Sequence, residues 1–319
     1  MQHISKTQKS ADSHAPKQIV VVGRHDDRAS YDTPQSMARE LNKRSSRTIY
    51  SQAILEQLLF VYDGSKLRVL DDENQDLSRH DGIFLIGWFK EKMLEDEALA
   101  VTMYAQAHGM SFLNSEAGRT RSNSKLSQCV AAVLHDVQTT PFVFAQDGVR
   151  LLQGVDQSNL TYPLIAKSVR ASRGNDNYLV GSRTELQKII TENPDVPFIV
   201  QAFVPNDGDY RVIVMGDTVK FVMHRKSQTD SHLNNTSQGG EAHEIAIDSL
   251  PAAMLDQSVA IAKVLHREIT GVDMIVDKTT GKHYFLEANN MPQLSTGSLV
   301  EAKTAALNTF LTTWIEATP

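Results

Sequence analysis

Cysteine is almost absent from this chain: Cys129 is the only one in 319 residues. A single thiol excludes an internal disulfide and is typical of a reducing compartment. Long apolar runs are also missing, since none approaches the ~20 residues needed to cross a bilayer. Basic residues are not in excess, because the formal net charge is -6 and the isoelectric point is about 6.0. We therefore expect a soluble, cytoplasmic protein with no membrane segment and no nucleic-acid partner.

Several catalytic signatures are missing as well. No Gly-x-Ser-x-Gly nucleophile elbow occurs, and Cys129 lies on a predicted helix with nothing nearby to activate it. The phosphate-loop pattern of glycines followed by Lys-Ser/Thr is absent. His25, His224, His232 and His243 have no partner at a spacing suited to zinc. The sequence therefore carries no signature of serine, cysteine or zinc chemistry.

The length predicts two or three domains. Residues 1–16 are polar and mixed in charge, and we expect a disordered tail rather than a signal peptide. Beyond this tail, apolar runs predict strands at 18–23, 83–87 and 111–114, and the spacing predicts helices at 36–43 and 95–108. This alternation indicates a small α/β domain over residues 17–115.

The remaining chain alternates short strands and helices. Strands are expected at 164–167, 178–180, 198–204, 210–215, 219–224 and 244–247, and helices at 122–136, 184–192, 252–268 and 301–316. Thr184 is the predicted N-cap of its helix. Residues 228–240 are polar and end in glycine, so they are the best candidate for a mobile loop.

Three oxygen-bearing side chains interrupt an otherwise apolar hairpin near the C-terminus. Asp273 lies in the run 269–276, and Glu287 and Asn289 lie in the run 284–289. Strand side chains alternate faces, so Glu287 and Asn289 point the same way. A buried carboxylate needs a partner or a cation, and two carboxylates with an amide suit a hard ion such as magnesium. Pairing of Asp273 and Glu287 with nearby Arg or Lys is the structural alternative.

The register of the hairpin offers a check on this prediction. If Asp273 lies opposite Glu287, then Asp277 faces His283 across a five-residue or bulged connection. All three candidate ligands would then gather on one face.

Lys167 ends an apolar strand and precedes a loop that contains serine and glycine. A lysine at this position can hold phosphate oxygens with a point charge beside backbone donors. A solvated loop with a lysine is the commoner alternative. Lys125, at the start of a predicted helix, has no functional meaning when taken alone.

Arg211 and Arg225 lie on neighbouring predicted strands within largely apolar runs. Arginine in such a setting needs an anionic partner, because its charge cannot be lost. Either residue could pair with Asp209 or with the hairpin carboxylates. Either could equally clamp a transferring phosphoryl group.

In chain order these pieces resemble the ATP-grasp superfamily and are most similar to its RimK-like carboxylate–amine ligase branch. The resemblance covers residues 116–319. It is carried by Lys125, Thr140-Pro141, Lys167, Ser172-Arg-Gly174, the hinge Val200-Gln-Ala-Phe-Val204, Asp209-Tyr-Arg211, Arg225, Asp273 and Glu287-Ala-Asn-Asn-Met-Pro292.

The resemblance implies an α/β (α+β) chain in which two lobes, residues 116–198 and 199–319, sandwich ATP after the N-terminal domain. The implied nucleotide contacts are Lys125, Lys167, Ser172 and Gly174 at the phosphates, Gln201, Phe203 and Val204 at adenine, and Asp209 on the ribose side. The implied metal ligands are Asp273, Glu287 and Asn289, for one or two Mg²⁺ ions, with Mn²⁺ as an alternative. Arg211 and Arg225 are the implied catalytic residues, which stabilise charge on the phosphoryl group.

The reaction implied by the resemblance joins a carboxylate to an amine through an acyl phosphate, releasing ADP and phosphate. Small molecules or peptides would supply both groups, and a homo-oligomer is compatible with the sequence. The alternatives are an ATP-grasp kinase that phosphorylates a hydroxyl and a non-catalytic ATP-binding regulatory protein. The chain departs from the family pattern at Ala202, where an acidic residue is frequent, at Gln238, where close relatives are basic, and at Gln293, where glycine is usual.

Overall fold

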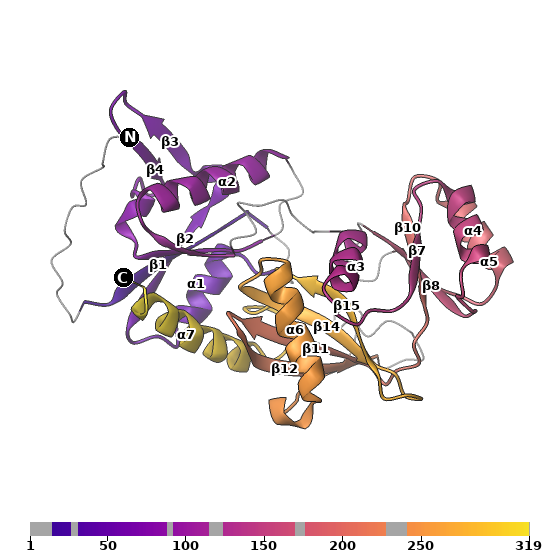
Figure 1. The fold of residues 1–319 in the computed structure, drawn as a ribbon. Helices are drawn as coiled ribbons and strands as arrows, with labels where there is room; N and C mark the ends of the chain where they lie inside the picture. Colours follow the sequence, from indigo (N-terminus) through magenta and orange to yellow (C-terminus); the bar gives the residue numbers. More distant parts are fainter. Residues whose placement is uncertain are drawn as a thin grey trace.

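The computed structural model of this chain describes residues 15–26, 31–87, 92–114, 124–169, 176–227 and 241–318, excepting the side chains of residues 92 and 93. These residues form three sheets and a separate two-stranded hairpin, with helices packed on the sheet faces (Figure 1). The mixed α/β architecture confirms the predicted fold class. Ser172, Gly174, Gln238 and the predicted loop 228–240 lie outside the described residues.

The N-terminal domain is built on a parallel sheet of order β2-β1-β5-β6. Its strands are β1 (Lys17–Gly23), β2 (Thr48–Ile54), β5 (Gly82–Leu85) and β6 (Ser111–Leu113), with helices α1 (Pro34–Asn42) and α2 (Lys92–Ala107). Because side chains alternate along a strand, Ile19 and Val21 pack with α1, whereas Val20 and Val22 pack with α2. The hairpin of β3 (Leu59–Tyr62) and β4 (Leu67–Leu70) adjoins this domain (Figure 1).

A second, antiparallel sheet has the order β7-β10-β8-β9. Its strands are β7 (Phe142–Phe144), β8 (Leu164–Ser168), β9 (Asn177–Val180) and β10 (Phe198–Ala202). Helices α4 (Gly148–Gln157) and α5 (Arg183–Glu192) cover one face, where Leu151, Leu186 and Val200 are buried. Helix α3 (Lys125–Leu134) reaches the other face through Cys129, which packs with Ile199.

The third sheet is antiparallel, with the order β13-β12-β11-β14-β15. Its strands are β11 (Asp209–Met215), β12 (Thr218–Lys226), β13 (Glu241–Glu244), β14 (Ile269–Val276) and β15 (His283–Asn289). Helix α6 (Ala252–Val264) covers one face through Met254 and Ile261. The apolar half of the other face packs against helix α7 (Val300–Glu316).

Helix α7 also contacts the N-terminal domain, so the two regions share one apolar core (Figure 1). Leu307 and Leu311 of α7 lie in the same cluster as Ile19 of β1 and Ile213 of β11. Polar contacts cross the same boundary, since the Tyr50 hydroxyl donates to Asn308 Oδ1 at 2.9 Å. The N-terminal domain and the large sheet are therefore joined by a continuous interior.

Several element boundaries differ from the predictions. The proposed division at 198/199 would cut β10, which pairs with β7 and β8 in the second sheet. Helix α5 is capped by Ser182, which accepts from the Glu185 N–H, and not by Thr184. The strand expected at 244–247 lies earlier, because Ile247 begins the short 3-10 helix η5 (Ile247–Ser249). The predictions omitted β2, β3, β4, β7 and α4.

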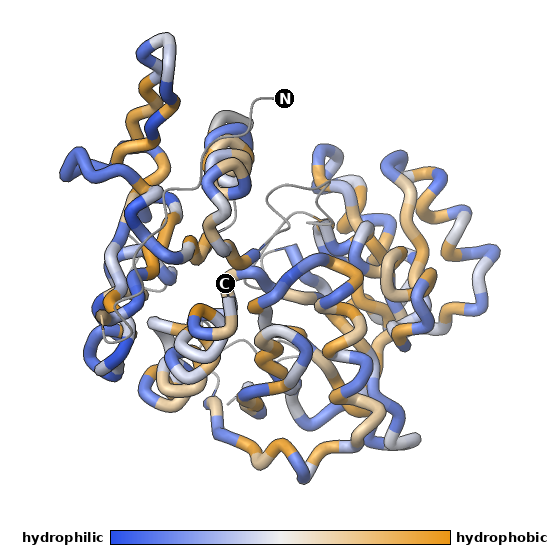
Figure 2. The backbone as a smooth tube through the Cα atoms, turned by 60° about the vertical axis from the view of Figure 1, so that its left-hand side comes forward, coloured by the Kyte–Doolittle hydropathy of each residue, from blue (hydrophilic) through white to orange (hydrophobic). Residues whose placement is uncertain are grey.

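None of the described helices is long and apolar enough to span a bilayer. In Figure 2 the backbone is coloured by hydropathy, and hydrophobic stretches along it are short and separated by hydrophilic ones.

Candidate functional site

One face of the large sheet is divided into an apolar half and a charged half. On β11, Ile213 and Met215 face the shared core with α7, and Arg211 and Asp209 follow on the same face at intervals of two residues. Asp209 lies opposite Arg225 of β12, while Arg211 lies opposite Asp273 of β14. Strand alternation alone therefore brings the charged side chains to one end of this face.

The hairpin β14–β15 gathers the three predicted metal ligands. Asp273 is paired with Glu287, which confirms the predicted opposition. A bulge between Asp273 and Met274 shifts the later pairs by one residue, so His283 faces Val276 and not Asp277 as predicted.

The Asn289 amide completes this group. Its Nδ2 donates to Asp273 Oδ2 at 3.2 Å and to Glu287 Oε1 at 3.3 Å. The Asn289 amide is therefore within hydrogen-bonding distance of both carboxylates on one face.

The two arginines form a buried network with Asp209 and Asp273. Arg211 donates from Nε and Nη2 to the two oxygens of Asp273, each at 2.9 Å. Arg225 donates from Nε to Asp209 Oδ1 at 2.6 Å, and its Nη2 lies 3.0 Å from Asp273 Oδ2. The structural alternative is thus realised, because both arginines contact the carboxyl groups of Asp209 or Asp273.

Electrostatics keep Asp273 and Arg225 ionised, whereas burial raises the pKa of Asp209 above its ordinary value despite the opposing effect of Arg225. Burial raises the pKa of Asp273, but Arg211 and Arg225 outweigh it and hold the pKa below its ordinary value. Burial lowers the pKa of Arg225, yet Asp273 and Asp209 raise it more, so the guanidinium stays charged. The Arg225 Nη2 atom is buried and has no well-aligned hydrogen bond among the described residues. It retains donor capacity for a further anion.

Lys125 and Lys167 face the same charged end from the smaller lobe. Lys125 is the first residue of α3, after the N-cap Ser124, and its Nζ lies 3.5 Å from Glu287 Oε2. Burial lowers the pKa of Lys167, and the nearby Lys125 ammonium lowers it further, against the opposing effect of Glu287 and Asp273. The nearby carboxylates do not fully offset the effect of burial on Lys167. Two neighbouring ammonium groups in this state are typical of a site for a polyanion.

Glu287 is the accessible carboxylate of the site, because its side chain is 31% exposed and that of Asp273 is 4% exposed. Burial raises the pKa of Glu287, but Lys125 and Lys167 outweigh this effect and hold the pKa below its ordinary value. Glu287 is therefore an anionic oxygen donor near neutral pH.

Sequence reasoning missed Gln128, which holds the two lobes together at this point. Its Oε1 accepts from the Ala288 N–H at 2.8 Å, and its Nε2 donates to the Ala288 carbonyl at 3.3 Å. Arg267 donates to the same carbonyl at 2.6 Å. Helix α3, with Lys125 at its start, is thus fixed to the strand that carries Glu287. A glutamine that binds only backbone groups leaves no spacing signal in a sequence.

The predicted adenine residues lie on β10 and the link that follows it. Gln201 is buried on the same face as Ile199, the cross-strand partner of Lys167, and donates from Nε2 to Thr140 Oγ1 at 2.9 Å. Its Oε1 is buried and has no hydrogen-bond donor among the described residues. Phe203 and Val204 lie in the link between β10 and β11, and Val204 is buried. The assignment of these residues to adenine stays a prediction.

The donor set on the hairpin fits a hard divalent cation. It contains carboxylate and amide oxygens, and Glu287 is both ionised and accessible. The Asn289 amide now turns its nitrogen to the carboxylates, and a rotation of that amide presents its oxygen without moving the backbone. Within the described part of the chain no group of three or more His, Cys, Asp or Glu is arranged to hold a metal, so the amide is needed to complete this set.

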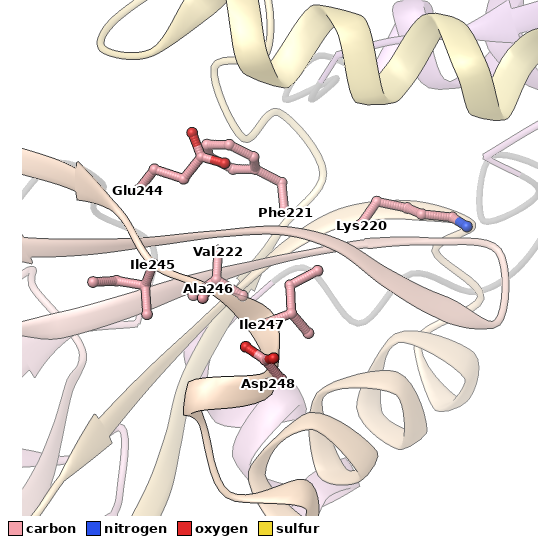
Figure 3. Close-up of a pocket in the computed structure, with 8 residues that line it drawn as sticks. All are labelled: Lys220, Phe221, Val222, Glu244, Ile245, Ala246, Ile247 and Asp248. Carbon is pink, nitrogen blue, oxygen red and sulfur yellow. The ribbon is translucent and has the colours of Figure 1, made fainter.

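A surface hollow of about 450 Å³ lies elsewhere, along the edge of β12 (Figure 3). It is lined by Lys220, Phe221, Val222, Glu244, Ile245, Ala246, Ile247 and Asp248. None of these is a predicted site residue, and its charged members are two carboxylates and one lysine. The hollow is poorly suited to a nucleotide phosphate.

Comparison with known proteins identifies the family of this chain. Residues 121–309 match the RimK-like ATP-grasp domain. A probable alpha-L-glutamate ligase of Sodalis glossinidius (strain morsitans) is 27% identical over 228 residues, which cover 68% of this chain and 72% of that protein.

Solved structures of the ATP-grasp ligase PsnB have the same fold. The complex with a minimal precursor has a TM-score of 0.66 and 16% identity, covering 95% of this chain and 99% of PsnB. The complex with minimal precursor, Mg and ADP has a TM-score of 0.62 and 16% identity, covering 93% and 98%. The match to the family domain spans more than half of the 319 residues. The chain belongs to the RimK-like ATP-grasp family.

Proposed function

We propose that this protein is an ATP-dependent ligase that joins a carboxylate to an amine. One observation carries the proposal. Four basic side chains converge on Asp273 and Glu287 of one hairpin, namely those of Lys125, Lys167, Arg211 and Arg225. A triphosphate with its divalent counter-ion is the ligand that suits such a mixture of cations and carboxylates.

The reaction proceeds in two balanced steps. A carboxylate oxygen of the substrate attacks the γ-phosphorus of ATP, the bond to the β–γ bridging oxygen breaks, and ADP leaves. The amine nitrogen then attacks the acyl carbon, the bond to the phosphate oxygen breaks, and phosphate leaves while the nitrogen loses a proton. Water must be excluded, since it would hydrolyse the acyl phosphate.

The side chains of this site divide the work. Lys125 and Lys167 hold phosphate oxygens, and Arg225, whose Nη2 lies 3.0 Å from Asp273 Oδ2, stabilises charge on the phosphoryl group in transfer. Arg211 supports the same charge beside Asp273. A magnesium ion held by Asp273, Glu287 and Asn289 would neutralise charge on the phosphates when bound. Whether one or two ions bind, and whether Mn²⁺ can replace Mg²⁺, stay predictions.

Asp209 has two candidate roles. Its predicted contact with the ribose stays a prediction, and its carboxylate accepts from Arg225 at 2.6 Å. We propose that Asp209 also orients the Arg225 guanidinium.

The relatives support a proposal for the substrate class. One curated relative is named a glutamate ligase, and PsnB was solved with a precursor. We propose that an amino acid or peptide supplies the carboxylate or the amine. The positions that a non-catalytic relative would be expected to lose are present here, namely the two arginines and the three metal ligands.

An ADP-release assay tests the proposal. The protein is incubated with Mg²⁺ and ATP and with pools of L-amino acids and short peptides, beginning with glutamate, and products are examined by mass spectrometry. We expect ADP release that depends on a pool and yields an amide. Glu287→Gln should reduce this release by about 100-fold or more, because one anionic ligand is lost. A phosphorylated hydroxyl as the product, or no ADP release with any pool, would refute the ligase.

A further inference from the structure

Asp32 and Lys303 are buried ionisable residues outside the predicted site. Their exposed fractions are 5% and 1%. A buried charge is unfavourable unless hydrogen-bond partners compensate it. The hydrogen-bond partners of both residues lie in one short segment, residues 293–296, which follows the metal hairpin along the chain.

Asp32 accepts four hydrogen bonds from this segment. The backbone N–H groups of Leu294 and Ser295 donate to its carboxylate at 2.7 and 2.9 Å. The hydroxyls of Ser295 and Thr296 donate at 2.9 and 3.1 Å. Asp32 precedes helix α1, so the N-terminal domain supplies the acceptor for these groups.

Lys303 acts on the same segment from helix α7. Its Nζ donates to the carbonyl of Gln293 and to the carbonyl of Thr296, the latter at 2.9 Å. One residue thus binds donors of the segment and the other binds acceptors. We name residues 293–296 with these contacts the clamped segment.

The clamped segment has a backbone that requires support. Gln293 has φ of 60°, in the left-handed region, and Leu299 beyond the segment has φ of 56°. This region is unfavourable for residues with a Cβ atom. The glycine usual in relatives at the position of Gln293 would adopt this conformation more easily. Contacts to Asp32 and Lys303 therefore fix a conformation that the local sequence does not favour.

Pro292, which directly precedes the clamped segment, lies against the same glycine, Gly271, as the side chain of Arg211. A Cβ atom placed on Gly271 would lie 2.7 Å from Pro292 Cβ and 3.2 Å from Arg211 Cδ. Pro292 and the stem of Arg211 therefore both pack on the backbone of β14 at Gly271 and leave no room for a side chain there. A shift of the clamped segment would move Pro292 and release Arg211 from its position on Asp273.

We propose that Asp32 and Lys303 are positioning residues for phosphoryl transfer, which fix the clamped segment so that Pro292 keeps Arg211 in place on Asp273. The inference rests on the proposed function, because Arg211 has this role only if a phosphoryl group is transferred there. It also gives the N-terminal domain a part in the chemistry, through Asp32.

The test compares Asp32→Asn and Lys303→Met with a matched control, Asp71→Asn. Asp71 is 7% exposed and accepts from the N–H groups of Glu73 and Gln75 at 3.0 and 2.8 Å, in a turn of the N-terminal domain. Like Asp32, it is a buried carboxylate that holds a loop, but its hydrogen-bond donors are Glu73 and Gln75 and not the clamped segment.

Two readouts separate positioning from general destabilisation. In the ADP-release assay, kcat should fall by about ten-fold or more in Asp32→Asn and Lys303→Met, with the KM for Mg-ATP within about two-fold of wild type. Amide hydrogen exchange of the peptide covering residues 292–299 should accelerate in both variants. Asp71→Asn should leave kcat and this exchange unchanged.

The outcomes also separate this inference from the proposed function. If both variants behave as Asp71→Asn does in kcat and exchange, the positioning role is wrong. If wild type releases no ADP with any pool, the proposed function fails. The amide exchange of residues 292–299 is then compared again in the presence of the non-hydrolysable probe Mg–AMPPNP. Unchanged exchange in the variants would show that Asp32 and Lys303 do not fix the clamped segment, and accelerated exchange would support that they do.

Discussion

Lys303 is buried with its amino group on two carbonyls, and its effect on stability can be calculated. Burial lowers the pKa of Lys303 to about 8 from an ordinary 10.5, while Asp32 raises it and Arg211 lowers it further. The two values differ by about 2.5 pH units. At about 1.36 kcal/mol per unit, the difference corresponds to about 3 kcal/mol.

The sign follows from proton binding. Near pH 7 both the folded and the unfolded chain carry this proton, so burying the charged form costs the fold about 3 kcal/mol. Between pH 8 and pH 10.5 the folded chain releases the proton while the unfolded chain keeps it, and the cost is relieved. The contribution of Lys303 to stability therefore rises with pH across this window. A neutral amine still has two N–H groups, so it can keep both carbonyl contacts.

Urea unfolding of wild type and Lys303→Met measures the effect. The difference in unfolding free energy between the two proteins removes the contribution of groups that titrate in both. From about pH 7 to about pH 10, we expect wild type to gain up to about 3 kcal/mol relative to the variant. A difference that stays flat over this range would contradict the burial of a charged lysine at this position.

Three further substitutions test packing and charge in the site, each by urea unfolding. Gln128→Leu leaves the buried N–H and C=O of Ala288 with fewer partners and should cost about 2 kcal/mol, and a loss below about 0.5 kcal/mol would argue against the bridge. Gly271→Ala places a Cβ 2.7 Å from a neighbouring side-chain carbon and should cost about 1–3 kcal/mol, whereas the control Gly181→Ala, with its nearest atom at 3.5 Å, should be close to neutral. Asp273→Asn leaves two buried arginines undercompensated and should cost about 3–5 kcal/mol, so a variant as stable as wild type would show that the network is not held by charge.

The sequence predicted the site best where chemistry follows strand alternation. Asp273, Glu287 and Asn289 could be placed on one face because side chains of a strand alternate, and the opposition of Asp273 to Glu287 is confirmed. The predicted partner of His283 was wrong, because a single bulged residue shifts every later pair. No local pattern announces such a bulge.

Other features depend on tertiary contacts that a sequence does not display. Gln128 and Asp32 bind backbone groups or hydroxyls far away in the chain, and Lys303 binds nearby carbonyls, so no residue type or spacing marks the three. The strands β3 and β4 were missed because they carry exposed apolar side chains and pair only with each other. The ends of β10 could not be assigned to a lobe, since an apolar run does not reveal its sheet partners.

The shared interior under helix α7 has a consequence for how this molecule can be divided. The family match covers residues 121–309, yet Leu307, Leu311 and the apolar half of the large sheet are buried partly by Ile19, Met37 and Phe84 of the N-terminal domain. Excising the matched segment would bare this surface to water and remove the last turns of the helix that covers it. The ATP-grasp part of this protein is therefore not an independent domain. An exchange of domains among relatives would have to transfer both sides of the interface between α7 and the N-terminal domain together.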